Sequence, residues 1–129
     1  MATLARPDLA AADRALRMSS AEAFQEASEL LGPRLVAFVC GVSETRAVRE
    51  WAKGERTPKD PAIEEKARLI VRVATFIADH DSRGVAQAWF QGLNPQLEDR
   101  SPARLLREGQ VAAVGPEIIQ AARAFVVGG

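Results

Sequence analysis

The segment from Asp60 to His80 constrains the fold more than any other part of the chain. Asp60 is a good N-cap and Pro61 suits the first helical position, so a long helix is predicted to begin here. Apolar residues then recur at helical spacing: Ile63, Ala67, Leu69, Ile70, Val71, Val73, Ala74, Phe76, Ile77 and Ala78. A helix that is apolar around so much of its circumference should be buried on more than one side. We predict a central helix, which either serves the core alone or also joins two modules or forms a dimer surface.

The rest of the chain also favours helices. Ser19 and Glu22 match a capping box, and Gly32-Pro33 ends the apolar helix that follows. Later helices are predicted to begin at Ser82, at Ser101-Pro102 and after Gly115-Pro116, with a loop from Leu93 to Arg100. No segment alternates with period two between hairpin turns, so we predict an all-α fold without a sheet.

Residues 1–18 form either a frayed tail or a short helix that begins at Asp8. In the helical alternative, Leu9, Ala12 and Leu16 share one side. Arginines and aspartates are mixed here and no apolar core of a leader is present, so a signal peptide is not expected. No apolar run approaches the ~20 residues that a membrane span needs.

Composition narrows the classes of function. The 129 residues include 17 Lys and Arg and 17 Asp and Glu, so the net charge is zero. Binding to DNA would therefore need a local basic patch, which dimerisation could double. Cys40 is the only cysteine, which excludes an internal disulfide and favours a reducing, cytoplasmic compartment.

Catalytic and metal sites are not indicated. His80 is the only histidine and is expected at a helix C-terminus, whereas Cys40 lies in an apolar run and is expected to be a buried thiol. These two residues do not supply a Cys/His metal cluster or a hydrolase triad. There is no glycine-rich phosphate loop either. We therefore expect a protein that is not an enzyme and uses no cofactor or metal.

The stretch from Gly41 to Gly54 predicts the turn and second helix of a helix-turn-helix. Gly41 permits a sharp turn with positive φ, and Val42 is expected to point into the core. Ser43 or Thr45 is expected to cap the second helix, while Val48 and Trp51 share its inner face. These inner residues come about one position late for this motif, so the turn is longer or the helix starts at Thr45. The alternative is an ordinary helical hairpin with a solvated charged face.

Two separated signatures resemble the Xre/MbcA/ParS antitoxins of bacterial toxin–antitoxin operons. The first is Val42-Ser43 followed by Trp51 to Pro58. The second is Ala88-Trp89-Phe90, Leu93-Asn94-Pro95 and Leu97, followed by Ser101 to Gly109. The resemblance covers about residues 20 to 129. It implies an Xre-like helix-turn-helix followed by a small helical toxin-binding domain. The implied partner is a RES-domain toxin, encoded by an adjacent gene, that degrades NAD.

The resemblance implies a division of the chain. Residues 1–18 would be the N-terminal tail or helix, 19–59 the helix-turn-helix module, 60–80 the connecting helix and 81–129 the toxin-binding domain. The chain would block the active-site cleft of the toxin and repress its own operon, as a homodimer or a hetero-oligomer with the toxin. The alternative is a helix-turn-helix regulator with a C-terminal dimerisation domain and no toxin partner.

Candidate residues follow for each role. The DNA-binding candidates are Ser43, Thr45, Arg46, Arg49, Lys53 and Arg56, which can contact phosphates or guanine edges. Residues 121–129 are expected to form a slender inhibitory tail. Phe90 is the better candidate than Trp89 for an exposed anchor, and the alternative for either is a core role, which is more common. The toxin-binding candidates are Phe90, Asn94, Arg104, Arg107, Arg123, Phe125, Val126, Val127, Gly128 and Gly129. Structural roles are predicted for Trp51, Trp89, Pro102 and Gly109.

Overall fold

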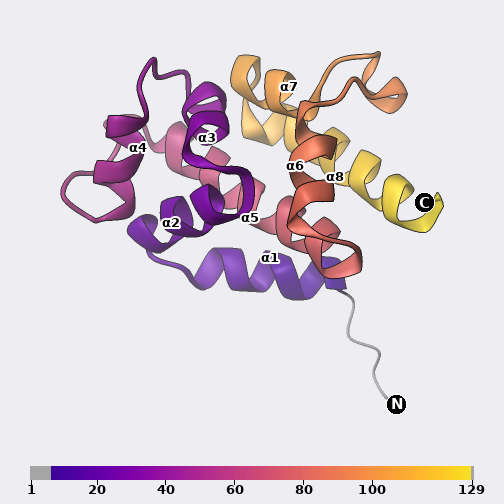
Figure 1. Ribbon diagram of the computed structural model, residues 1–129, viewed down its shortest axis with the longest axis horizontal. Coiled ribbons are helices and arrows are strands. Elements are labelled where there is room, and N and C mark those ends of the chain that lie inside the picture. Colours follow the sequence, from indigo (N-terminus) through magenta and orange to yellow (C-terminus); the bar gives the residue numbers. More distant parts are fainter. Residues whose placement is uncertain (1–6, 129) are drawn as a thin grey trace.

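The computed structural model describes residues 7–128, which form eight α-helices and one short 3-10 helix (Figure 1). The predictions for residues 1–6 and for Gly129 lie outside the described residues. Within 7–128 there is no strand, and one isolated β-bridge pairs Asn94 with Arg100. The all-α prediction is therefore confirmed. The elements are α1 (Pro7–Arg17), α2 (Ser20–Leu31), α3 (Pro33–Cys40), α4 (Thr45–Ala52), α5 (Pro61–His80), α6 (Arg83–Gln91), η1 (Pro95–Leu97), α7 (Pro102–Glu108) and α8 (Val111–Gly128).

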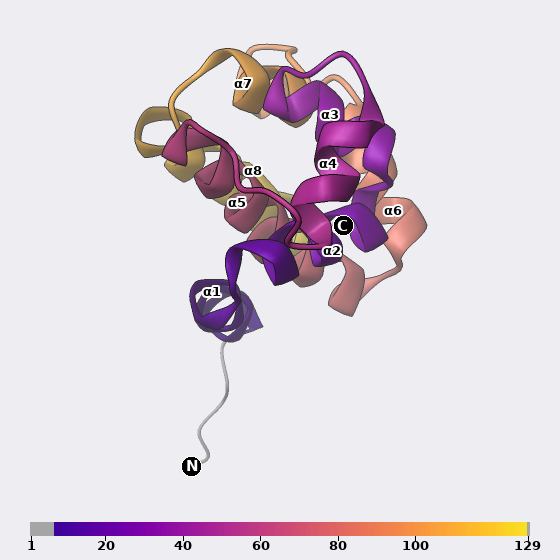
Figure 2. The same cartoon turned by 90° about the vertical axis from the view of Figure 1, so that its left-hand side faces the viewer.

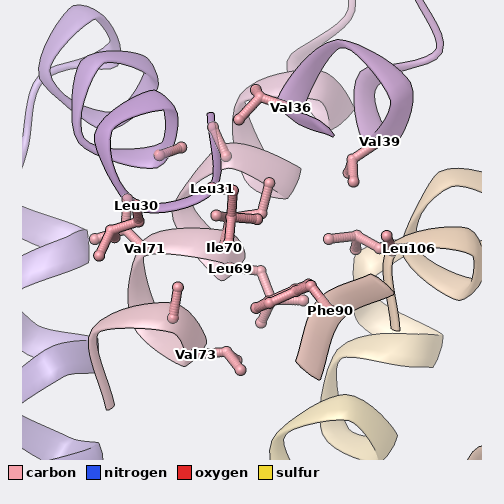
Figure 3. Packing of buried hydrophobic residues seen from close by; sticks show 14 of the residues in the cluster. Leu30, Leu31, Val36, Val39, Leu69, Ile70, Val71, Val73, Phe90 and Leu106 are labelled. Carbon is pink, nitrogen blue, oxygen red and sulfur yellow. The ribbon is translucent and has the colours of Figure 1, made fainter. Parts of the chain in front are cut away.

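Helix α5 is central, as its apolar pattern predicts. It packs against α1, α2, α3, α6 and α8. Ile70, Val71 and Ile77 of α5 are fully buried. Figure 3 shows α5 residues meeting buried side chains from α2, α3, α6 and α7. Residues 19–59 and 81–128 therefore share one hydrophobic core through α5.

Local caps set the helix starts that the sequence predicts. The Ser19 hydroxyl accepts a hydrogen bond from the Glu22 amide at 3.1 Å, and the Glu22 carboxylate accepts one from the Ser19 amide at 2.9 Å. The Asp60 carboxylate accepts from the amide of Ala62 at 2.9 Å, directly before α5. Ser82 and Ser101 cap α6 and α7 in the same way. Each cap satisfies an amide that has no partner inside its helix.

The predicted start of the last helix is wrong. Helix α8 begins at Val111, and Gly115-Pro116 lies inside it. Proline removes one helical hydrogen bond but does not prevent the preceding turn from forming. That turn is anchored because Val114 and Gly115 are buried, with Gly115 next to Leu69 of α5. Packing against α5 thus outweighs the local signal of Gly-Pro.

The predicted apolar side of the first helix is also wrong. Helix α1 exists, but Ala11 and Ala15 face the core, whereas Leu9 and Leu16 are exposed. Two small alanine side chains let α1 lie close to α5, and this close packing decides which side is buried.

The prediction that no apolar run approaches the length of a membrane span does not hold for α8. Its 18 residues have a mean hydropathy of 1.3, so by length and composition alone it is long and apolar enough to cross a membrane. One such helix is weak evidence for a membrane span, because core helices of soluble proteins can have the same length and composition. In this fold α8 packs against α5, α7 and η1, and Ile118, Ala121 and Ala122 are buried.

Candidate functional site

Helices α2, α3 and α4 form a compact unit at one end of the molecule (Figures 1 and 2). Gly41 ends α3 with a φ of 76°, as the predicted sharp turn requires. Val42 follows and packs partly buried against the core. Inside the unit, Val48 and Trp51 of α4 are buried, and the Trp51 ring lies 5.0 Å from that of Phe24. The opposite side of α4 is therefore turned outward.

The predicted cap of α4 is wrong. Helix α4 starts at Thr45, its N-cap is Glu44, and no side chain caps it. Ser43 and Thr45 therefore make no capping bond, because Ser43 lies one residue before the N-cap and Thr45 is already helical. The late start at Thr45 accounts for the late spacing of Val48 and Trp51. It also leaves the first backbone amides of α4 without a side-chain acceptor.

The outward side of α4 carries charges of both signs. The Arg46 Nε lies 3.1 Å from one carboxylate oxygen of Glu50, and Arg56 Nη1 lies 3.3 Å from the other. Glu50 thus neutralises part of the positive charge of two predicted DNA contacts. Arg49 and Lys53 are exposed and make no ion pair or hydrogen bond with any residue that the structure describes. We call Arg46, Arg49, Glu50 and Lys53 the α4 face.

A second surface lies at the other end of the molecule, between α6, η1 and α8. A groove of about 550 Å³ opens here and is lined mainly by apolar side chains. Its floor includes Trp89, whose ring centroid lies 6.4 Å from that of Phe125. Leu93 is 78% exposed and Phe125 is 39% exposed. We call this surface the C-terminal groove; its lining is Val85, Ala88, Trp89, Gly92, Leu93, Asn94, Pro95, Gln96, Ala121, Ala124 and Phe125.

Two expectations about this region are wrong. Phe90 is 0% exposed, so it is a core residue and not an exposed anchor. Trp89, on the adjacent position of α6, is the aromatic residue that lines the groove. Residues 121–128 are also not a slender tail: they continue helix α8, and Ala121 and Ala122 are buried. Val127, which is 88% exposed, and Gly128 stand at the end of that helix.

Asn94, predicted to bind the toxin, lines the groove, and the predicted structural residues Pro102 and Gly109 lie outside its lining at the two ends of α7. The Asn94 carboxamide oxygen accepts a hydrogen bond from the Gln96 amide at 2.9 Å, which fixes the loop by bonding to its own backbone. Pro102 is fully buried at the start of α7. A Cβ atom at Gly109 would collide with the side chain of Val114, so any larger residue there would require Val114 to shift.

Leu93 is an exposed, large apolar groove residue that the predicted site residues do not include. It follows the glycine that ends α6 and precedes Asn94-Pro95. A large apolar residue in a turn, outside any helical period, is a signal that could have identified it.

The predicted toxin-binding arginines lie on different surfaces. Arg104 is exposed and its Nε lies 3.0 Å from a carboxylate oxygen of Glu108. Arg107 contacts Phe38 of α3, on the side of the molecule that carries α4. Arg123 is near Arg72 of α5, away from the C-terminal groove. The structure thus does not bring these three side chains together.

Neither Cys40 nor His80 belongs to these surfaces. Burial raises the pKa of the Cys40 thiol to about 12, outweighing the opposite effect of the nearby Lys66 charge. The thiol is therefore protonated at neutral pH and a poor nucleophile. His80 is at the end of α5, as predicted, and its Nδ1 lies 3.1 Å from the Phe76 carbonyl oxygen. Across residues 7–128, no three His, Cys, Asp or Glu side chains are grouped to hold a metal ion.

Comparisons with known proteins give no relative. No protein-family model, no curated protein and no solved structure matches the chain.

Proposed function

We propose that this chain is an antitoxin that binds a RES-domain, NAD-degrading toxin and blocks its active-site cleft. The observation that carries this proposal is the C-terminal groove. It is formed by the same Trp89, Leu93 and Asn94-Pro95 residues that resemble the antitoxin family. Blocking a cleft requires affinity and shape but no chemistry from the inhibitor.

The groove has the character of a protein-binding surface. Two exposed apolar side chains line the groove beside the Trp89 ring. One is Leu93, in the turn before η1, and the other is Phe125, on α8. Large apolar side chains gathered on an exposed surface are typical of interaction sites, and buried aromatic anchors dominate interface energies. In this proposal the end of α8 enters the mouth of the toxin cleft, while the groove holds the surrounding toxin surface.

We further propose that the α4 face binds the promoter DNA of the operon. Arg49 and Lys53 point outward from the helix that the motif assigns to the major groove. Glu50 opposes this binding by pairing with Arg46 and Arg56, so the affinity of the free protein for DNA should be low. A complex with the toxin would raise the affinity for DNA, because it would hold several copies of this chain on one duplex.

The alternative is a transcription regulator without a toxin, in which the C-terminal groove binds a second copy of the chain. The same exposed Leu93 and Phe125 favour it, because apolar side chains of this size can also be covered by self-association. The mass of the purified chain, measured alone and with the product of the adjacent gene, separates the two functions.

The decisive experiment is co-expression of the chain with the product of the adjacent gene. We expect the two proteins to purify as one complex and the antitoxin to prevent the loss of cellular NAD that the toxin alone causes. NAD is measured in cell extracts with and without the antitoxin. Undiminished NAD loss in the presence of soluble antitoxin would refute the proposed neutralisation.

A further inference from the structure

Helix α7 packs against α3 on the side of the molecule that carries α4 (Figures 1 and 2). A separate cleft lies there, beside the N-terminus of α4. Its volume is about 360 Å³. Four polar side chains line it: Arg34 from α3, Ser43 and Thr45 from the turn and the start of α4, and Arg107 from α7. No acidic residue is part of the lining. We call this surface the α3–α7 cleft, and it is both polar and positively charged.

Arg107 is held in place at this cleft. Its Nη1 donates a hydrogen bond to the Phe38 carbonyl oxygen at 2.6 Å, and its guanidinium carbon lies 4.7 Å from the centroid of the Phe38 ring. Lys66 of α5 donates a hydrogen bond to the Arg107 carbonyl oxygen at 3.0 Å. A guanidinium has five N–H donors, so this single side-chain hydrogen bond leaves most of them available to a ligand.

No carboxylate neutralises the arginines of the cleft. Neither Arg34 nor Arg107 forms an ion pair with an acidic residue anywhere in the described part of the chain. Arg104, one turn before Arg107 on α7, is instead paired with Glu108. Two unneutralised guanidinium groups from different helices face one cleft, which is an arrangement suited to an anion.

We propose that Arg34 and Arg107 bind backbone phosphates of the duplex that α4 contacts, so that the DNA interface extends from α4 onto α7. This inference rests on the proposed DNA binding by the α4 face. A helix in a major groove brings flanking phosphates next to the elements around its N-terminus, and the cleft opens there. Ser43 and Thr45 supply hydroxyl donors at the same place.

The test measures how salt weakens binding to a mixed-sequence duplex of about two helical turns (~21 bp). Each phosphate contact contributes about −0.9 to the slope of log K against log salt concentration. We expect R107Q and R34Q each to make this slope shallower by about 0.9, whereas R107K, which keeps the charge, preserves it. R104Q is the matched control, because it removes a charge from the exposed side of α7 outside the cleft, and its slope should equal that of the unmodified protein.

The outcomes separate this inference from the proposed function. If R49Q makes the slope shallower but R107Q and R34Q do not, the α4 face binds DNA and the inference is wrong. If R107Q leaves the slope unchanged and weakens co-purification with the toxin, the cleft belongs to the protein partner, which also overturns the inference. If the unmodified chain binds no duplex even at low salt, the proposed DNA binding and the inference both fail.

Discussion

At the scale of single residues, Glu50 controls the charge of the α4 face. Its two carboxylate oxygens pair with Arg46 and Arg56, and its own side chain is mostly shielded from solvent. Arg46 and Glu50 lie in the predicted second helix of the motif and Arg56 follows it, but the sequence does not reveal that one carboxylate engages two arginines. Arg56 lies in the loop after α4, and only the return of that loop toward α4 brings it to Glu50.

Replacing Glu50 with glutamine should therefore strengthen binding to DNA. E50Q removes one negative charge and releases Arg46 and Arg56, so we expect the slope of log K against log salt to steepen by about 1 to 2. Both arginines are exposed to solvent, which screens their ion pairs with Glu50, so the free energy of unfolding should fall by only about 0.2–1 kcal/mol. Fluorescence anisotropy of a labelled duplex over a salt series measures the slope.

E55Q is the matched control for this prediction. Glu55 is exposed in the same loop and makes no ion pair with any described residue, so its replacement changes the net charge equally without releasing an arginine. An equal increase in slope for E50Q and E55Q would show that net charge, and not the release of Arg46 and Arg56, determines binding.

At the scale of elements, the sequence predicts helix starts best where hydrogen bonds between neighbouring residues determine them. The starts of α2 and α5 depend on Ser19 and Asp60, whose side chains bond to amides two or three residues ahead. The predicted central role of α5 also holds, because an apolar surface on several sides leaves no other placement.

The sequence predicts helix bounds and burial poorly where contacts between distant segments determine them. The first turn of α8 forms around Val114 and Gly115 because α5 and α7 cover it, and no residue near Pro116 carries that information. Likewise, Trp89 and Phe90 are adjacent and both suit a core. The packing of α6 against α5, α2 and α7 decides which one is enclosed: Phe90 is fully buried, whereas Trp89 lines the groove beside Phe125 of α8.

The proposed inhibitory role of the end of α8 is tested by two truncations of different length. Removing residues 126–129 takes away exposed Val127 and partly buried Val126, so the melting temperature should fall by no more than about 5 °C. Removing residues 121–129 also deletes buried Ala121 and Ala122 and exposes Trp89. It should cost about 2 kcal/mol or more, at ~0.8 kcal/mol per buried CH₂ group.

The chain that lacks residues 126–129 should stay folded but should no longer inhibit the toxin. NAD consumption by purified toxin and thermal unfolding of each variant are measured side by side. Full protection by the chain lacking residues 126–129 would exclude insertion of the helix end and leave the C-terminal groove as the inhibitory surface.

At the scale of the whole molecule, one core supports two separate surfaces. The α4 face and the C-terminal groove are built on α2–α4 and on α6–α8, and α5 joins both sets of helices. A substitution that loosens the core should damage both activities together. A substitution at an exposed position should damage only the activity of its own surface, because it leaves the shared packing intact.

Arg49→Glu and Leu93→Asp test this independence directly, because both residues are exposed and on different surfaces. We expect R49E to weaken duplex binding by at least ~10-fold, since it reverses a charge next to phosphates, and to leave toxin affinity within about 2-fold. L93D should do the reverse, weakening toxin binding by ~30-fold or more, because a carboxylate would be buried unpaired against an apolar partner surface. Anisotropy with DNA and calorimetry with toxin provide the two affinities, and melting temperatures show that both variants are folded. If either folded variant lost both affinities to the same extent, the two partners would share one surface, and the assignment of DNA to α4 and toxin to the groove would be wrong.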